Sequence, residues 1–186
     1  ARGICEQGGA TFLQPFDDYE VMAGQGTVAL EILSELPTVD TVVVPVGGGG
    51  LISGVAACIK QVNPRVRVVG VQAEGACAVY KSFKAGKHMT TDGVSTIADG
   101  IAVGNPGEKT TAEILRCVDD MVTVSDNDIS SAILLLMERS KLIVEPAGAS
   151  SLAAVLAGKV DAKGKRTVCL LSGGNIDVSV IHRVVE

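Results

Sequence analysis

The sequence predicts an α/β fold built on an open, mostly parallel and twisted sheet with helices on both faces. Short apolar runs rich in Val alternate with longer helix-like segments, and this alternation is typical of parallel strands joined by right-handed crossovers. The runs lack polar residues at every second position, which indicates strands that are covered on both faces. Hydrophobic residues make up 47% of the 186 residues, enough for one domain with a sizeable core.

Four apolar runs are the expected strands. In open parallel sheets, ligands bind outside the carboxyl ends of the strands. We therefore expect a functional site in the loops that follow these runs. The expected strands are residues 42–46, 66–71, 121–124 and 168–171.

Helix signals fill the intervals between these runs. Residues 26–36 carry apolar side chains at every fourth position and end before Pro37. Residues 125–128 form an N-terminal capping signal, so a helix is expected over residues 129–141. The remaining expected helices are residues 1–7, 51–62, 76–84, 109–118, 147–157 and 177–185.

Composition and charge exclude several classes of partner. The net charge is −5 and basic residues form no stripe, so we expect no nucleic-acid partner. No apolar run reaches about 18 residues and no signal peptide is visible, so we expect no membrane span and a cytoplasmic location. The five cysteines fit no zinc pattern, and Cys58 and Cys169 are expected to be buried thiols. His88 and His182 lack partners at metal-binding spacing, and no metal site is predicted.

A run of four glycines follows the first expected strand and precedes a helix. Backbone N–H groups at a helix start attract anions, and glycines let the backbone approach a phosphate closely. Residues 51 and 52 are Leu and Ile, where a P-loop needs Lys and Ser or Thr. A broken dinucleotide fingerprint, with Glu74 at the acidic position, and a packing turn without ligand remain open alternatives.

Further polar candidates lie near the other expected strand ends. Ser172 follows the last strand, where its hydroxyl can contact a ring nitrogen without adding charge, or can cap a helix near Asn175. Glu145 emerges from an apolar stretch, so it needs a partner or a polar cavity, unless it only begins a helix. Asp99 is expected in a turn, and Gln25 or Thr27 as a helix cap.

Five motifs, in order from about Gly9 to Val178, resemble the threonine dehydratase (threonine ammonia-lyase) family. This family uses pyridoxal 5′-phosphate and has the tryptophan-synthase β-like fold, also called fold type II. The resemblance implies that residues 17–186 form the large, cofactor-binding domain and that residues 1–16 end the smaller domain. The motifs are residues 17–27, 44–51, 98–100, 144–149 and 171–175.

The resemblance also implies a cofactor site and a reaction. The hydroxyl of Ser172, beside Gly173, would face the pyridine nitrogen, while Glu145 and Gly100 would lie near the ring. The enzyme would remove water and ammonia from L-threonine or L-serine, giving a 2-oxo acid, and would be a homo-oligomer. The cofactor phosphate would bind at Gly47, Gly48, Gly49, Gly50 and Leu51.

The imine-forming lysine of this family lies in an amino-terminal segment that we do not find here. The letters Ser82-Phe83-Lys84 match its usual context but fall on an interior helix, so we interpret them as coincidence. Lys60 and Lys141 are interpreted as surface charges at helix ends. We therefore expect a fragment that is inactive alone and either self-associates or needs a complementary amino-terminal fragment.

Two other functions remain open from the sequence. Serine racemases and serine dehydratases share the glycine loop, but Gln72 and Ala78 stand where racemases carry acidic metal ligands, although Glu74 is close by. This departure favours threonine dehydratase. A different class is a non-catalytic module that binds a phosphate cofactor or a nucleotide without turnover.

Overall fold

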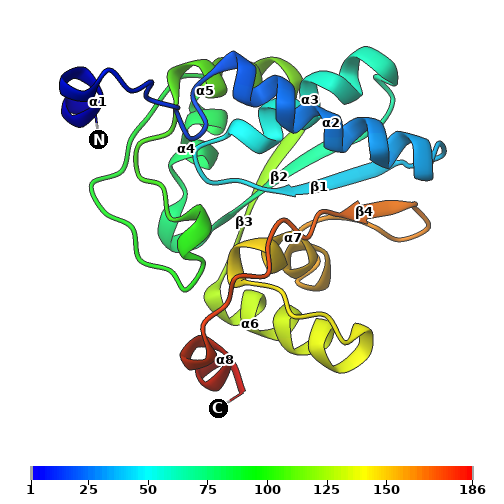
Figure 1. The fold of residues 1–186 in the computed structure, drawn as a ribbon. Helices are drawn as coiled ribbons and strands as arrows, with labels where there is room; N and C mark the ends of the chain where they lie inside the picture. Colours follow the sequence, from blue (N-terminus) through cyan, green and yellow to red (C-terminus); the bar gives the residue numbers. More distant parts are fainter. Residues whose placement is uncertain (1, 186) are drawn as a thin grey trace.

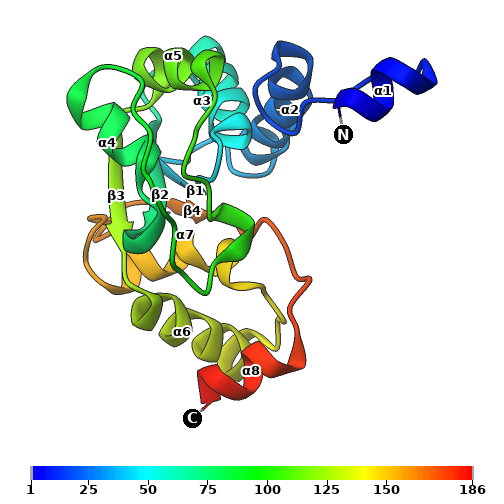
Figure 2. The same cartoon turned by 90° about the vertical axis from the view of Figure 1, so that its left-hand side faces the viewer.

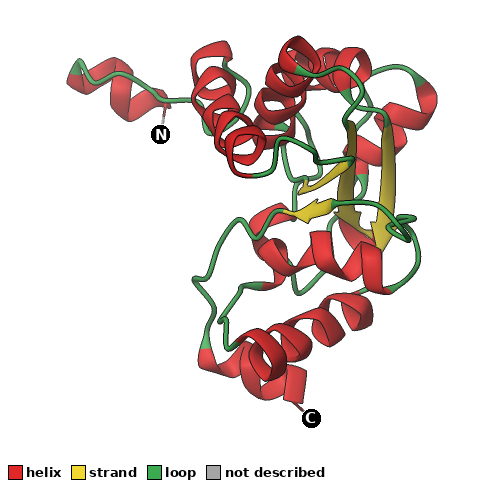
Figure 3. Cartoon of the chain, turned by 90° about the vertical axis from the view of Figure 1, so that its right-hand side faces the viewer, coloured by secondary structure: helices red, strands yellow, loops and turns green. Residues whose placement is uncertain are grey.

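The computed structural model describes residues 2–185, and a parallel four-stranded sheet in the order β3-β2-β1-β4 forms its centre. Helices cover both faces of this sheet (Figures 1 and 3), so the expected open parallel α/β fold is confirmed. The strands are β1 (Thr41–Pro45), β2 (Arg67–Ala73), β3 (Asp120–Val124) and β4 (Thr167–Cys169). The α-helices are α1 (Arg2–Gly8), α2 (Tyr19–Glu35), α3 (Gly50–Val62), α4 (Ala78–Ala85), α5 (Glu108–Cys117), α6 (Asp126–Leu135), α7 (Pro146–Leu156) and α8 (Val178–Val185).

Two apolar cores lie on opposite faces of the sheet. Val42 and Val44 of β1 point into the core beneath α2, α3 and α5, whereas Val43 points into the core that contains α6 and α7. Successive side chains of a strand face opposite sides, so a strand buried on both faces must be apolar throughout. All residues of β1 are buried, as the apolar run predicted.

The strands differ in burial according to their place in the sheet. The central strand β2 is buried at every position except Arg67. The edge strand β4 is only half-buried throughout, and β3, at the other edge, is buried at Met121 and Val124. The expectation that all four strands are covered on both faces is therefore wrong for β3 and β4. Their apolar sequences do not reveal that each has a single neighbouring strand.

Helix α2 begins at Tyr19, well before the expected start at residue 26. Asp18 is its N-cap and accepts a hydrogen bond from the Glu20 N–H at 2.8 Å. A Cβ on Gly26 would lie 3.2 Å from the Gly54 carbonyl oxygen, so the glycine allows α2 to approach α3 closely. Gln25 and Thr27 therefore lie inside α2, and the expectation that either caps the helix is wrong.

The other helices agree closely with the sequence. Ser125 and Asp128 form the reciprocal capping box that begins α6. The α6 helix passes into a π-helix, Leu136–Ser140, which ends at Lys141 with a φ of 59°. The short helix α1 is followed by Gly9, which has a φ of 65°, and it projects from the rest of the molecule (Figure 2). Whether residues 1–16 belong to a second domain stays a prediction.

Two expectations from the sequence concern membrane spans and the burial of the cysteines. Within residues 2–185, no helix combines the length and apolar character needed to cross a membrane. The five cysteines are free thiols, and Cys117 is buried, while Cys58 and Cys169 are only half-buried. Burial raises the pKa of the Cys169 thiol to about 11, so it is protonated at neutral pH.

Candidate functional site

One cavity of about 350 Å³ at the carboxyl end of the sheet collects the predicted site residues. The loop after β1, the turn at Asp99–Ile101, the start of α7 and the loop after β4 all contribute to its wall. Among the predicted site residues, only Gly173 does not line it. The two glycine loops thus face a single cavity, as the carboxyl ends of neighbouring parallel strands should. The predicted residues in its wall are Gly47, Gly48, Gly49, Gly50, Leu51, Gly100, Glu145 and Ser172.

The loop after β1 presents backbone donors without partners. Gly48 and Gly50 are buried, and Gly49 is the N-cap of α3 with a φ of 99°, a conformation that favours glycine. Within the described chain, none of the N–H groups of residues 47–51 donates a hydrogen bond. Buried N–H groups without acceptors are costly, and a helix start adds a positive dipole end. The loop therefore has the chemistry of an anion site.

The carbonyl groups of the same loop do have partners. The Thr110 hydroxyl donates to the Gly48 oxygen at 2.7 Å. The Gln72 side-chain amide donates to the oxygens of Val46 and Gly47, at 3.1 and 3.5 Å. The acceptors of the loop are thus satisfied by the protein, and its donors are left for a ligand. The contributions of Gln72 and Thr110 were not predicted from the sequence, because no local signal links them to the loop.

Phe16 covers the glycine loop from the side of the preceding segment. A Cβ on Gly48 would lie 2.5 Å from the Phe16 ring, and a Cβ on Gly50 would lie 2.9 Å from the Phe16 Cβ. Two of the four glycines are therefore needed for close packing as well as for ligand approach. Phe16 lines the cavity without filling it. Phe16 was not predicted from the sequence; its only signal is an aromatic ring in a chain that is 3% aromatic.

Glu145 is held between α7 and the loop after β4. It occupies the N-cap position of α7, and its backbone N–H donates to the Gly173 oxygen at 3.1 Å. Its carboxylate accepts a hydrogen bond from the Asn175 N–H at 3.1 Å. A Cβ on Gly173 would collide with this carboxylate, so Gly173 leaves room for Glu145. Glu145 therefore combines both expectations: it begins a helix and it has a partner beside the cavity.

Ser172 and Gly100 also contribute to the cavity wall. Ser172 is exposed, and α8 begins only at Val178, so the alternative that Ser172 caps this helix is wrong. Gly100 lies in a 3-10 turn, where a Cβ would be 2.9 Å from the Ala147 Cβ and 3.4 Å from the Glu145 carboxylate. The Asp99 carboxylate accepts from the Gly100 N–H at 2.8 Å, which is the local turn expected for it.

The lysines singled out in the sequence lie elsewhere, and no lysine is among the described residues that line the cavity. The Lys84 ammonium is 3.2 Å from the Asp120 carboxylate, and the interpretation of its motif as coincidence stays a prediction. Lys141 is exposed, as expected. Lys60 is not a free surface charge, because its side chain is 20% exposed and its ammonium lies 2.7 Å from the Asp119 carboxylate.

Two of the positions considered for a metal, Gln72 and His88, make other contacts. The Gln72 amide oxygen accepts from the Tyr80 N–H at 2.8 Å, and the side chain is fully buried. The His88 ring lies 2.9 Å from the Pro106 oxygen. Among residues 2–185, no cluster of three or more His, Cys, Asp or Glu residues has the arrangement of a metal site.

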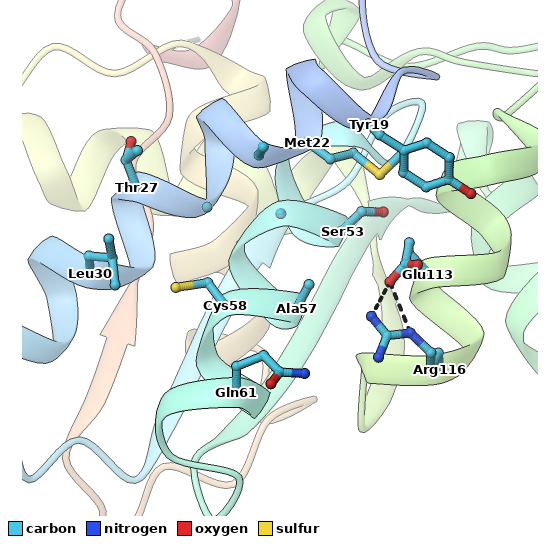
Figure 4. Close-up of a pocket in the computed structure, with 13 residues that line it drawn as sticks. Tyr19, Met22, Thr27, Leu30, Ser53, Ala57, Cys58, Gln61, Glu113 and Arg116 are labelled. Carbon is cyan, nitrogen blue, oxygen red and sulfur yellow. Dashed lines mark hydrogen bonds and ion pairs between the residues drawn. The ribbon is translucent and has the colours of Figure 1, made fainter.

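A second cavity, of about 410 Å³, lies between α2, α3 and α5 (Figure 4). Met22 and Leu30 of α2 face Ala57 and Cys58 of α3 across it, and an ion pair between Glu113 and Arg116 lies at its side. None of the predicted site residues lines this cavity, and its wall is mostly apolar. We therefore place the candidate site in the cavity between the two glycine loops.

Comparison with known proteins identifies the family of this chain. The model of the family described as "Pyridoxal-phosphate dependent enzyme" matches residues 1–173. The chain belongs to this family. It is 50% identical over 183 residues to the L-threonine ammonia-lyase of Thermotoga maritima, covering 98% of this chain and 45% of that protein.

Solved structures of the family share the fold of this chain. The processed threonine deaminase isoform 2 of Solanum lycopersicum superposes with a TM-score of 0.92 at 36% identity, over 98% of this chain and 51% of that chain. Maize serine racemase superposes with a TM-score of 0.90 at 36% identity, over 99% and 57% of the two chains. This chain therefore spans about half the length of its relatives.

Proposed function

We propose that this chain provides the cofactor-binding part of a pyridoxal-phosphate enzyme that eliminates water and ammonia from L-threonine or L-serine. The observation that carries the proposal is one cavity lined both by the unpaired N–H groups of the first glycine loop and by Ser172 of the second. The likeness to an L-threonine ammonia-lyase supports the substrate class. The product would be a 2-oxo acid.

The residues of the cavity fit the parts of the cofactor. The N–H groups of residues 47–51 would bind the phosphate, because they lack partners and stand at the start of α3. The Ser172 hydroxyl would hydrogen-bond the pyridine nitrogen, and Glu145 and Gly100 would lie against the ring. Gly173 would keep Glu145 in place. When bound, the cofactor supplies an electron sink for the α-carbon of the substrate.

The choice of serine at position 172 bears on the reaction. A hydroxyl adds no negative charge, so it does not hold the ring nitrogen in its protonated form, as an aspartate would. A neutral nitrogen favours rapid elimination over transamination. Ser172→Asp should therefore slow elimination and raise side reactions. An unchanged product ratio in this variant would contradict the role of Ser172.

We also propose that the imine-forming lysine is supplied from outside this chain. The cavity wall carries glycine, apolar and carboxylate side chains but no lysine among the described residues. Borohydride treatment of the chain mixed with cofactor should give no pyridoxyl-lysine peptide in mass spectrometry. One specifically labelled lysine of this chain would overturn this part of the proposal and leave the phosphate site untouched.

The substrate test needs the lysine-bearing part. Co-expressed with the amino-terminal half of a threonine ammonia-lyase, the chain should release 2-oxo acid and ammonia from L-threonine faster than from L-serine. A reconstituted enzyme that binds the cofactor but converts neither amino acid would contradict the proposed reaction. The likeness to maize serine racemase makes racemisation the second candidate, and formation of D-serine as the main product would favour it.

The partner surface that we propose is the open edge of the sheet at β4. This strand has one neighbour, and Cys169 and Leu171 line an apolar cavity of about 330 Å³ beside it. An uncovered strand edge and apolar patch favour self-association or binding of a complementary amino-terminal fragment. Light scattering should show oligomers of the isolated chain that dissociate when this fragment is added. A monodisperse monomer that does not bind the fragment would contradict the proposed partner surface.

The five free thiols support a further proposal, that the protein resides in the reducing cytoplasm. Cell fractionation should place it with cytoplasmic markers. Recovery from an oxidising compartment would contradict this assignment.

A further inference from the structure

Thr110 is a buried side chain that contacts the glycine loop from behind. It is fully buried on α5, and its hydroxyl lies 2.7 Å from the Gly48 oxygen and 3.2 Å from the Gly107 oxygen. A hydroxyl has one proton to donate, so the shorter contact is the stronger hydrogen bond. Thr110 is not in the cavity wall, and it touches the loop on the side away from the cavity.

This contact bears on the cavity because it fixes the orientation of the peptide group between residues 48 and 49. In a trans peptide, the C=O of one residue and the N–H of the next point in opposite directions. No peptide bond in residues 2–185 is cis. Holding the Gly48 oxygen toward α5 therefore directs the Gly49 N–H away from α5, toward the cavity that Gly49 lines.

The glycine at position 49 makes such an anchor necessary. Glycine adopts positive and negative φ with similar ease, so the peptide between residues 48 and 49 has alternative orientations. The observed φ of 99° at Gly49 is one of them. The Gly107 N–H adds a longer contact of 3.4 Å to the same Gly48 oxygen. Two donors of α5 and its cap thus select one orientation.

Asp17 fixes the position of Thr110 in turn. Its carboxylate accepts a hydrogen bond from the Thr110 N–H at 3.1 Å. The same carboxylate lies so close to Gly107 that no Cβ fits there. Asp17 directly follows Phe16, which covers Gly48 and Gly50. Two separate segments of the chain, residues 16–17 and the start of α5, therefore hold the glycine loop in place.

We infer that Thr110 is a positioning residue that sets the affinity of the glycine loop for phosphate. It acts through the Gly48 carbonyl, which it holds so that the Gly49 N–H faces the ligand. This inference rests on the proposed function, because it assumes that the loop binds a phosphate group. It adds a residue 62 positions away from the loop to the machinery of the site.

The experiment is a titration of the chain with inorganic phosphate, followed by amide chemical shifts of residues 47–51. Thr110→Val keeps the shape of the side chain and removes its donor, so it should weaken phosphate binding about tenfold. Thr110→Ser restores the hydroxyl and should bind within about twofold of the original chain. Thr111→Val is the matched control, because Thr111 is also buried but donates to the Gly107 oxygen at 2.6 Å.

The outcomes separate this inference from the proposed function. If the original chain shows no phosphate response at residues 47–51, the proposed function and the inference both fail. If it responds, but Thr110→Val binds equally well or Thr111→Val weakens binding as much, only the inference fails. Should Thr110→Val not fold, Thr110→Cys keeps the volume with a weak donor and takes its place. An unchanged affinity in that folded variant overturns the inference.

Discussion

The two glycine loops of the cavity are supported in opposite ways. The loop after β1 follows a central strand, its glycines 48–50 are buried, and Gln72 and Thr110 hold its carbonyl groups. The loop after β4 follows a half-buried edge strand, and Ser172 at its start is exposed. Similar glycine-rich sequences thus have different support, because the place of a strand in the sheet decides how many neighbours its loop has.

This difference separates two kinds of contribution to the site. The first loop is fixed by contacts within the described chain, so changes in it should lower the free energy of unfolding. The second loop has fewer such contacts, so changes in it should affect ligand chemistry more than folding. Substitutions in the two loops, in β2 and in β4 test this contrast.

Gly49→Ala should be the most damaging single change in the first loop. The φ of 99° disfavours a side chain, and its Cβ would lie 2.9 Å from the Thr110 Cβ and the Ile114 Cδ1. We expect the free energy of unfolding in urea to fall by about 3 kcal/mol. Gly158→Ala is the matched control, because Gly158 has a φ of 68° but open space around it, and it should cost about 1 kcal/mol. Equal losses would show that packing around the loop adds nothing.

Gln72→Leu should also destabilise the protein strongly. The fully buried amide bonds the Val46 and Gly47 oxygens and the Tyr80 N–H, and leucine would leave all three without this partner. A loss of about 2 kcal/mol is expected in urea unfolding. The exposed Gln61 on α3 provides the comparison, since Gln61→Leu should change stability by less than about 0.5 kcal/mol. A small effect of Gln72→Leu would mean that the hydrogen bonds of Gln72 do not stabilise the first loop.

The edge strand should make stability sensitive to high pH. Burial raises the pKa of Cys169 on β4 to about 11, so the folded chain holds its proton where the unfolded chain has lost it. This contribution is complete below the unfolded pKa of about 9 and is lost as pH rises toward 11, on the order of 1 kcal/mol by pH 10. Urea unfolding of the chain and of Cys169→Ala at pH 7 to 10 measures it. Parallel pH curves for the two proteins would contradict the assignment.

Ser172→Ala should have the smallest effect on folding. Ser172 is exposed, so the free energy of unfolding should change by less than about 0.5 kcal/mol. Ser53→Ala, by contrast, removes a buried hydroxyl that donates to the Thr110 oxygen at 3.2 Å and should cost about 1 kcal/mol. Thermal unfolding of the two variants compares them directly. A larger loss for Ser172→Ala would show that the second loop is part of the folded core.

Sequence patterns located most elements and both loops, because their signals are local. Apolar runs marked all four strands to within a few residues, and the Ser125 capping box marked the start of α6. The same reasoning failed at the start of α2, where Gly26 suggested a boundary but lies inside the helix. It also failed at β4, whose apolar residues are only half-buried. At α2 the deciding contact is local, because Asp18 caps the helix through the Glu20 N–H, whereas at β4 the burial depends on strands that are distant in the sequence.

The order of residues by itself determined where strands and helices form and where the backbone must be glycine, since these depend on neighbouring residues and on local conformational preference. Only the folded arrangement decided which peptide groups of residues 47–51 face the cavity, because the Gly48 carbonyl is held by Thr110, 62 residues away. It also decided that β1 is central and β4 lies at an edge, since strand pairing joins segments across the whole chain.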